Sequence, residues 1–289
     1  MRIKQVAKTE GGQDGAIYGS ELFRFSSKGN CSVYDLTGID GKDVCELSPI
    51  ASFKLDLSDV IAPHSNAVCF GCEFYDEEDK YPLLYTNIYN NYANEEDKLI
   101  GVCCVYRIQR DKNEFKSTLV QLIQIGFCDN PELWQAYPDK HCDRPYGNFV
   151  IDNDTRSYYA FVMRNEELGT RYFKFDLPSC KEGEIDLRFG VKKAVLGAED
   201  IKEYFDTAHH RYIQGAIFHD GKIYSTEGFQ NDEKNRPAIR IIDTRTKAEV
   251  YIDLMDMGYL REPEFIVFYN GDCYYSDAHG NLYYIDFDA

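Results

Sequence analysis

The chain of 289 residues has one tryptophan, six histidines and far fewer basic than acidic side chains. Lys and Arg total 32 against 49 Asp and Glu, which gives a net charge of -17. A surface this acidic repels phosphate backbones and anionic lipids. We therefore expect neither nucleic acid nor a membrane among the partners of the protein.

Long apolar segments are missing as well. No apolar run approaches the roughly 18 residues that span a bilayer, and the opening MRIKQVAKTEGGQDG lacks the apolar stretch of a signal peptide. These absences predict a soluble, cytoplasmic protein, in which thiols stay reduced. Most of the ten cysteines lie inside strand-like patterns such as GVCCVYRI, where Cys acts as a small buried apolar residue. We expect free thiols.

Motifs for several kinds of chemistry are also absent. The chain contains neither a G-x-S-x-G nucleophile elbow nor a G-x-x-x-x-G-K-[ST] phosphate loop. The alternative of a zinc site rests on Cys69 and Cys72 with Cys103 and Cys104. Residues i and i+3 of a strand face opposite sides, and no second C-x-x-C follows. We expect no metal and no cofactor.

Aromatic residues, in contrast, are abundant, with 23 Tyr and 18 Phe. Strands accept such residues readily, and in this chain they belong to a five-fold repeat of strand patterns. Each repeat opens with a short apolar strand: QDGAIYG, HSNAVCFG, YGNFVID, IQGAIFHDG and EPEFIVFYNG. A second strand follows. The third strand ends in an apolar residue plus a charge: Tyr34-Asp35, Tyr106-Arg107, Phe175-Asp176, Ile242-Asp243 and Ile285-Asp286.

A fourth, outer strand is visible in four repeats only, as SPIASFKL, STLVQLIQIGF, VKKAVLG and KAEVYIDL. The fifth repeat lacks it, while MRIKQVAK alternates apolar and polar residues and has no other partner. A ring of sheets closes well when both termini share one blade, because the last open edge is then paired. The sequence predicts an all-β single domain over residues 1–289, a five-bladed β-propeller with its last blade closed by the N-terminal strand. The alternative, a β-sandwich with a small sheet domain, would need a linker.

Helix is scarce, and the best candidates are AEDIKEYFDTAHH and NPELWQAY, in connections between repeats. In a propeller these connections surround one end of the central channel, and loops on a rigid scaffold tend to carry binding sites. The longest runs from Phe127 to Tyr146 and holds the only tryptophan. Loops of this length are usually functional or disordered, and its Trp, Tyr and Pro argue for order. We expect Trp134 near the rim of the channel.

The starts of the inner strands suggest a site. Each begins with one polar residue: Asp14, Asn66, Asn148, Gln214 and Glu264. Other polar residues come just before them: His64, Arg144, His210, Arg211, Arg261 and Glu262. Equivalent positions surround the axis of a propeller, and buried polar groups need partners. We therefore predict a ligand-binding site at the channel mouth, formed by Asp14, His64, Asn66, Trp134, Arg144, Asn148, His210, Gln214, Glu262 and Glu264. A merely water-filled channel is the alternative.

The fourth repeat shows a resemblance to known proteins. IQGAIFHDGKIYSTEGFQ, IRIIDTRTKAEV and EPEFIVF resemble the repeat of five-bladed propellers similar to glutamine cyclotransferases and to receptor-binding platforms of some phages. The matching features are Gln214-Gly215, the second strand between Gly221 and Gly228, Asp243, and Glu262 to Glu264. Where the cyclotransferase pattern has Glu-Ser-Thr-Gly, this chain has Ser225-Thr226-Glu227-Gly228, and Phe265 stands where the pattern prefers Gly.

Three function classes follow from these observations. The first, which we expect, is a binding module that recognises a small or saccharide-like ligand, or a protein partner, at the channel mouth. The second is an enzyme. The resemblance implies an acyl-transfer cyclase, whereas convergence of Asp14, Glu262 and Glu264 would supply the two carboxyl groups of a glycoside hydrolase. The third is a structural platform in a larger assembly. The sequence assigns no catalytic residue.

Overall fold

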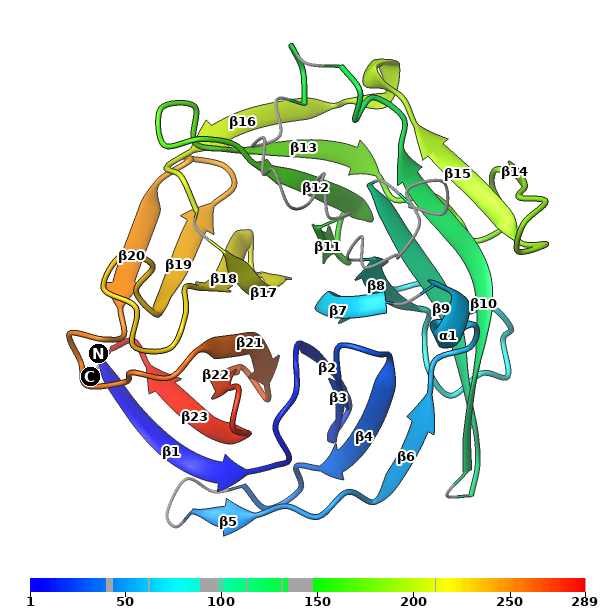
Figure 1. The fold of residues 1–289 in the computed structure, drawn as a ribbon. Coiled ribbons are helices and arrows are strands. Elements are labelled where there is room, and N and C mark those ends of the chain that lie inside the picture. The colour runs from blue at the N-terminus through cyan, green and yellow to red at the C-terminus, as the bar shows by residue number, and fades with distance from the viewer. Residues whose placement is uncertain are drawn as a thin grey trace.

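The structure, a computed structural model, is a five-bladed β-propeller, which confirms the fold predicted from the repeat. Five sheets stand around a central axis, and one strand of each lies at the centre (Figure 1). The structure describes residues 1–39, 44–61, 63–88, 99, 101–112, 114–130, 132–134, 148–210 and 212–288. Helix is limited in these ranges to the single turns α1 (Ser58–Ile61) and η2 (Ala198–Asp200).

Each blade is built from an inner strand, beside the axis, outward to an edge strand. Blade 1 consists in this order of β2 (Gly15–Tyr18), β3 (Glu21–Phe25), β4 (Asn30–Asp35) and β6 (Ala51–Lys54). Blade 2 consists of β7 (Pro63–Phe70), β8 (Leu84–Ile88), β9 (Val102–Asp111), β10 (Glu114–Ile125), β15 (Lys192–Leu196) and β14 (Glu184–Ile185). Blade 3 consists of β11 (Phe149–Asp152), β12 (Ser157–Met163), β13 (Thr170–Asp176) and β16 (Glu203–Thr207). Blade 4 consists of β17 (Ile213–His219), β18 (Lys222–Glu227), β19 (Ala238–Asp243) and β20 (Glu249–Asp253). Blade 5 consists of β21 (Pro263–Tyr269), β22 (Asp272–Asp277), β23 (Asn281–Asp286), β1 (Arg2–Lys8) and β5 (Cys45–Glu46).

The N-terminal strand completes the last blade. β1 pairs antiparallel with β23, with Arg2 opposite Asp286 and Lys8 opposite Asn281, and the two chain ends lie side by side (Figure 1). Val6 on β1 is buried in an apolar cluster that contains residues of both blade 5 and blade 1. The predicted closure of the ring by the N-terminal strand is confirmed.

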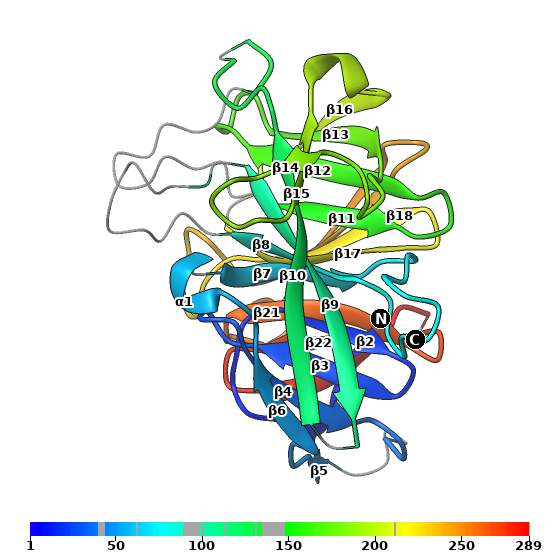
Figure 2. The same ribbon diagram turned by 90° about the vertical axis from the view of Figure 1, so that its right-hand side faces the viewer.

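Two outer strands differ from the prediction. VKKAVLG contains β15, which pairs in parallel with β10 and so extends blade 2 instead of completing blade 3 (Figure 2). The outer strand of blade 3 is β16, within the segment expected to be helical. Its side chains alternate, because Phe205 and Thr207 are buried while Tyr204 and Asp206 are exposed. Phe205 stacks on Tyr172 of β13 with 5.2 Å between ring centroids, and this packing favours the strand.

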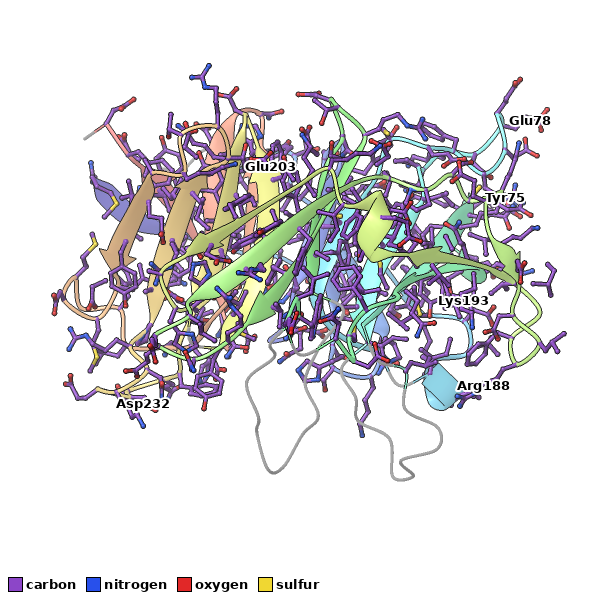
Figure 3. All side chains as sticks on the ribbon, turned by 90° about the horizontal axis from the view of Figure 1, so that it is seen from above. Tyr75, Glu78, Arg188, Lys193, Glu203 and Asp232 are labelled. Atoms are coloured by element: carbon purple, nitrogen blue, oxygen red, sulfur yellow. The ribbon has the colours of Figure 1, made fainter. Side chains whose placement is uncertain are left out.

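The inner strands set the position of the channel. β17 contacts β21 and β11 of the adjacent blades and also β7 of blade 2, so the strands approach closely at the axis. All five inner strands begin on the same face of the propeller, which we call the mouth face. Asp232, in the loop between β18 and β19, marks this face in Figure 3, and Glu78 and Glu203 mark the opposite face. No helix in the described ranges is long and apolar enough to cross a membrane.

Deleting residues 1–8 tests the closure. We expect a strongly lowered melting temperature, because the deletion leaves the edge of β23 unpaired and uncovers buried side chains. Val6→Asp should also destabilise strongly, since Val6 is 1% exposed and an unpaired charge is costly there. Lys8→Asp, at an exposed position of the same strand, is the control. Thermal unfolding measures all three proteins, and a truncated chain that melts like the full-length one would contradict the closure.

Candidate functional site

β-Bulges present polar side chains at the mouth of the channel. The pairing of β17 with β18 shifts between Ile213 and Gly215, which leaves Gln214 as the extra residue. β21 has the same irregularity at Glu264, and a longer one in β7 includes Asn66. A bulge re-aims a side chain and interrupts the ladder, and bulges are frequent next to active sites. Three of the five polar residues at the starts of the inner strands therefore occupy bulge positions.

An asparagine of blade 2 links two of the predicted site residues. The Nδ2 group of Asn87, on β8, donates to Oδ1 of Asn66 and, at 2.8 Å, to Oδ1 of Asn148. Its Oδ1 accepts the backbone N–H of Asn66 at 3.1 Å. All three side chains are buried. These hydrogen bonds connect blade 2 to blade 3, so the three asparagines stabilise the contact between the two blades.

Asp14 connects blades 1 and 2 in a similar way. Its carboxylate accepts the backbone N–H of Gly15 at 2.7 Å and that of Val68, on β7, at 2.8 Å. The side chain is 1% exposed. Burial raises the pKa of Asp14 above its ordinary value, although the two N–H groups oppose the rise. Asp14 thus joins two blades through main-chain hydrogen bonds.

A buried arginine is the centre of a third group. Arg24, on β3, is 2% exposed, and its guanidinium lies 4.5 Å from the ring centroid of Phe265. Nη2 donates to the carbonyl oxygens of Gly12 and Asp277 at 3.0 and 3.1 Å. Among the described residues, Nε and Nη1 of this guanidinium have no hydrogen-bond partner. Burial lowers the pKa of Arg24 to about 10, although nearby carboxyl groups, Glu264 first, oppose the shift.

Glu264 belongs to the same group. It is 3% exposed, and its Oε2 atom is buried without a hydrogen-bond partner in the part of the chain that the structure describes. Burial raises the pKa of Glu264 to about 8; the charge of Glu262 adds to the rise and Arg24 opposes it. At neutral pH the carboxyl group is therefore mostly protonated and can donate as well as accept a hydrogen bond. A neutral acid and a guanidinium with unused N–H groups can bind a polar molecule.

The rim beside Glu264 carries an acid, an amide and aromatic rings. Nε2 of Gln214 donates to Oε1 of Glu262 at 2.6 Å and to the carbonyl oxygen of Gly228 at 3.1 Å. Glu262 is only partly buried, and this burial raises its pKa. Tyr212 and Phe229 pack together with 4.3 Å between ring centroids. Tyr212 is 39% exposed and has a φ of 55°, an uncommon conformation for tyrosine.

The missing side chain of Gly215 lets these groups come together. A Cβ atom at this position would lie 2.5 Å from the carbonyl oxygen of Glu264 and 3.1 Å from Oδ1 of Asp14. The inner strands of blades 4, 5 and 1 thus converge where a methyl group would not fit. This close approach explains why a glycine follows Gln214 in the sequence.

Two predicted site residues lie away from the channel mouth. Trp134 is 2% exposed and stacks on Phe173 of β13 with 5.7 Å between ring centroids. It is a core residue rather than a rim residue, because its large apolar ring fills the space over blade 3. His210 is fully buried at hydrogen-bond distance from Tyr172 and 3.9 Å from Glu249, among the outer strands of blades 3 and 4. Burial lowers the pKa of His210 to about 4.

The remaining predicted residues are placed as follows. His64 lies on β7, two residues before Asn66, and is partly buried. Arg261 is half-exposed in the loop before β21 and lies 3.5 Å from Asp277. Arg144 and Arg211 lie outside the described residues. Of the ten predicted site residues, the structure thus brings Gln214, Glu262 and Glu264 together with Arg24, while Asp14, Asn66 and Asn148 join the blades beside them.

Sequence reasoning missed Arg24, Asn87 and Asp277. All three lie at the ends of second strands. Because a second strand runs antiparallel to the first, it ends on the face where the first begins, and its last residues surround the same mouth. The available signal was a polar residue inside an apolar strand, as in LFRF and LYTNI, since such a residue needs a partner when buried.

The cysteines of the described residues form no disulfide bonds. Cys142 lies outside the described residues, and each of the other cysteines is a free thiol. Over the same ranges, no group of three or more His, Cys, Asp and Glu side chains is arranged to hold a metal ion. The groups assembled at the mouth are carboxyl, guanidinium, amide and aromatic side chains.

Comparison with solved structures finds two enzymes of similar fold and one weaker match. Glutaminyl cyclase from Myxococcus xanthus is 10% identical with a TM-score of 0.52, and the match covers 99% of this chain and 94% of that one. The exo-β-1,3-galactanase of Phanerochaete chrysosporium is 10% identical with a TM-score of 0.50, and the match covers 98% of this chain but 64% of that one. Hydrazine synthase of Kuenenia stuttgartiensis gives 11% identity and a TM-score of 0.44 over 91% of this chain and 61% of that one.

Neither the comparison with protein-family models nor that with curated proteins gives a match. At about one identical residue in ten, the structural similarity establishes the fold alone. The chain is therefore a five-bladed β-propeller like the cyclase and galactanase propellers.

Replacing Glu264 by Gln tests the burial of this acid. The pKa of Glu264 in the folded chain, about 8, lies above the ordinary value of 4.5, so the unfolded chain releases the proton at lower pH than the folded chain. The wild-type free energy of unfolding should fall as the pH rises from 4.5 to 8 and then level off. Glu264→Gln has no such proton to lose, so its free energy of unfolding should not fall in this way. Between pH 4.5 and 8 the free energy of unfolding of the variant should therefore rise by a few kcal/mol relative to that of the wild type.

Denaturant unfolding at several pH values measures the difference between the two proteins. Glu78→Gln is the matched control, because Glu78 is exposed on the face opposite to the mouth (Figure 3) and should leave the pH profile unchanged. A difference between Glu264→Gln and the wild type that does not change with pH would contradict the burial of an ionisable Glu264.

Proposed function

We propose that the protein binds a small, neutral, hydroxyl-rich ligand of saccharide-like chemistry at the mouth of the channel. The observation that carries the proposal is one cluster of buried polar atoms that have no partners within the described residues: Oε2 of Glu264 and both Nε and Nη1 of Arg24. Buried polar atoms nearly always have hydrogen-bond partners in native proteins. A ligand that supplies those partners would therefore be stabilised at this position.

The charges at the mouth favour a neutral ligand. Burial and the charge of Glu262 keep Glu264 protonated at neutral pH, while Asp14 and Asp277 lie near the guanidinium of Arg24. The acidic groups around Arg24 offset its positive charge, so little net attraction for an anionic ligand remains at the mouth. A hydroxyl group can accept from Arg24 and exchange hydrogen bonds with Glu264 in either direction, because it both donates and accepts.

The rim offers the complementary surface. The rings of Tyr212 and Phe229 pack together. Gly228, the residue before Phe229, donates to the carbonyl oxygen of Tyr212 and accepts from Gln214, which is also hydrogen-bonded to Glu262. An aromatic face next to amide and carboxyl groups suits a molecule with one apolar side and hydroxyl groups at its edge. The galactanase structure contains β-1,3-galactotriose, so a protein with a propeller of this architecture binds a saccharide.

A second candidate function is glycoside hydrolysis. Two carboxyl groups from neighbouring positions, Glu262 and Glu264, both have raised pKa values caused by burial, and a raised pKa is what a proton-donating acid requires. Glu264 would protonate the leaving group, and Glu262 would act as the second carboxyl group. The cyclase alternative has less support. Glu227 is the acid of the segment that resembles the Glu-Ser-Thr-Gly pattern of the cyclases, and its Oε1 atom forms an ion pair with Nη2 of Arg240 at 2.8 Å.

Two substitutions of Glu264 test the binding of a saccharide at the channel mouth. We expect Glu264→Ala to weaken binding of a saccharide about tenfold, the effect of a lost buried hydrogen bond, without lowering the melting temperature. Glu264→Gln should bind like the wild type, because an amide replaces a protonated acid as donor and acceptor. Saturation-transfer NMR with neutral mono- and disaccharides measures both affinities, with Glu78→Gln as the control. Unchanged affinity in Glu264→Ala, or no binding of any saccharide by the wild type, would contradict the proposal.

Nitrophenyl glycosides test the second candidate. If Glu264 donates a proton, wild-type hydrolysis should decline as the pH rises through about 8. Glu264→Gln should then bind the glycoside but lose turnover, since an amide cannot release the proton. Absence of hydrolysis by the wild type, together with retained binding, would leave the binding function and reject the catalytic one.

A further inference from the structure

A hollow lies on blade 5. Its volume is about 580 Å³, within the range of roughly 300–1,000 Å³ that is typical of ligand pockets. One wall is the loop from Gly258 to Arg261, between β20 and β21, and the floor is formed by β1, β22 and β23. These three strands lie together in blade 5, the blade beside which both chain termini lie (Figure 1).

Three tyrosines form the aromatic side of this hollow. Tyr275 and Tyr283 are cross-strand neighbours on β22 and β23 and stack with 4.7 Å between ring centroids and 13° between ring planes. Tyr259 meets Tyr283 edge-on at 5.4 Å. Its hydroxyl donates to the carbonyl oxygen of Ile3 at 2.8 Å, which holds the loop against β1. The rings are therefore fixed before any ligand arrives.

Polar side chains adjoin the rings in a defined arrangement. The Asp277 carboxylate is 1% exposed and accepts from Nδ2 of Asn281 at 2.7 Å and from the Tyr283 hydroxyl at 3.2 Å. Oδ1 of Asn281 accepts from Nε2 of Gln5 at 3.0 Å. Arg261 lies 3.5 Å from the same carboxylate and is half-exposed. Asp277 thus orients the groups, and Gln5 and Arg261 retain further hydrogen-bonding capacity, since an amide and a guanidinium carry several donors.

One tyrosine hydroxyl of the hollow is not accounted for by the protein. Tyr275 is 1% exposed, and its hydroxyl, unlike those of Tyr259 and Tyr283, has no hydrogen-bond partner in the described ranges. A buried hydroxyl without a partner is costly. Because Tyr275 lines the hollow, a ligand there would supply the missing partner.

We propose that this hollow, the blade 5 pocket, binds one pyranose-sized hydroxylated ring. The apolar face of the ring would pack on Tyr283 and Tyr259, as amphipathic rings do on aromatic side chains. Its hydroxyl groups would bond to Gln5, Arg261 and the Tyr275 hydroxyl. The lining combines aromatic and amide groups with the cations Lys4 and Arg261 and the Asp277 carboxylate. This mixture suits a hydroxylated ring better than a purely apolar molecule. The proposal does not rest on the function proposed for the channel mouth.

Saturation-transfer NMR with methyl galactoside, methyl glucoside, methyl mannoside and N-acetylglucosamine tests the pocket. We expect at least one of these sugars to bind the wild type in the millimolar range. Gln5→Ala and Tyr275→Phe should each weaken that binding about tenfold, the loss of one hydrogen bond to the ligand. Tyr275→Phe should not lower the melting temperature, because its hydroxyl has no protein partner to lose.

Two control variants locate the effect. Tyr284→Leu changes the next residue of β23, which faces the other side of the sheet, and should leave binding unchanged. Glu78→Gln, at an exposed position on the face opposite to the mouth, should also leave it unchanged. Failure of all four sugars to bind the wild type would overturn the proposal. So would binding that Gln5→Ala and Tyr275→Phe leave intact, and a loss confined to Glu264→Ala would assign the sugar to the channel mouth instead.

Discussion

The antiparallel pairing of β1 with β23 turns five separate sheets into a closed ring, and every other feature of the molecule depends on that closure. Each blade packs an apolar face against the next, so a missing outer strand would leave both an unpaired edge and exposed side chains between blades 5 and 1. Closure also brings Asp277 and Arg24, from opposite ends of the chain, within hydrogen-bond distance at 3.1 Å. The candidate site therefore exists only in the closed ring.

The second constraint is the narrow space at the axis. Gly215 allows blades 4, 5 and 1 to converge, and the carboxyl of Glu264 and the guanidinium of Arg24 become buried there. Burial of ionisable groups lowers stability unless partners compensate it. Asp14 has backbone N–H groups and Arg24 has two carbonyl oxygens and the ring of Phe265. The carboxyl group of Glu264 instead takes up a proton. Groups with pKa values perturbed in this way cluster at functional sites.

Strand patterns carried most of the fold information. The third-strand endings such as Ile242-Asp243 and the unpaired MRIKQVAK segment predicted the blades and their closure, because alternation and edge pairing are local properties. The local pattern did not show that β15 joins blade 2 and that β16 joins blade 3. The sheet that a strand joins depends on the path of the loop before it. For the site, inner-strand positions predicted Gln214 and Glu264. Arg24 required the tertiary arrangement of a second strand, and Trp134 was assigned to the rim although its ring stacks in the core.

Titration of the Glu264 side chain by carbon-13 NMR, assigned with Glu264→Gln, tests most directly whether the channel mouth is a site built around a buried, protonated acid. The account predicts a carboxyl signal that titrates near pH 8. A signal that titrates near the ordinary value of 4.5 would show that Glu264 is solvated and charged at neutral pH, and it would contradict the account.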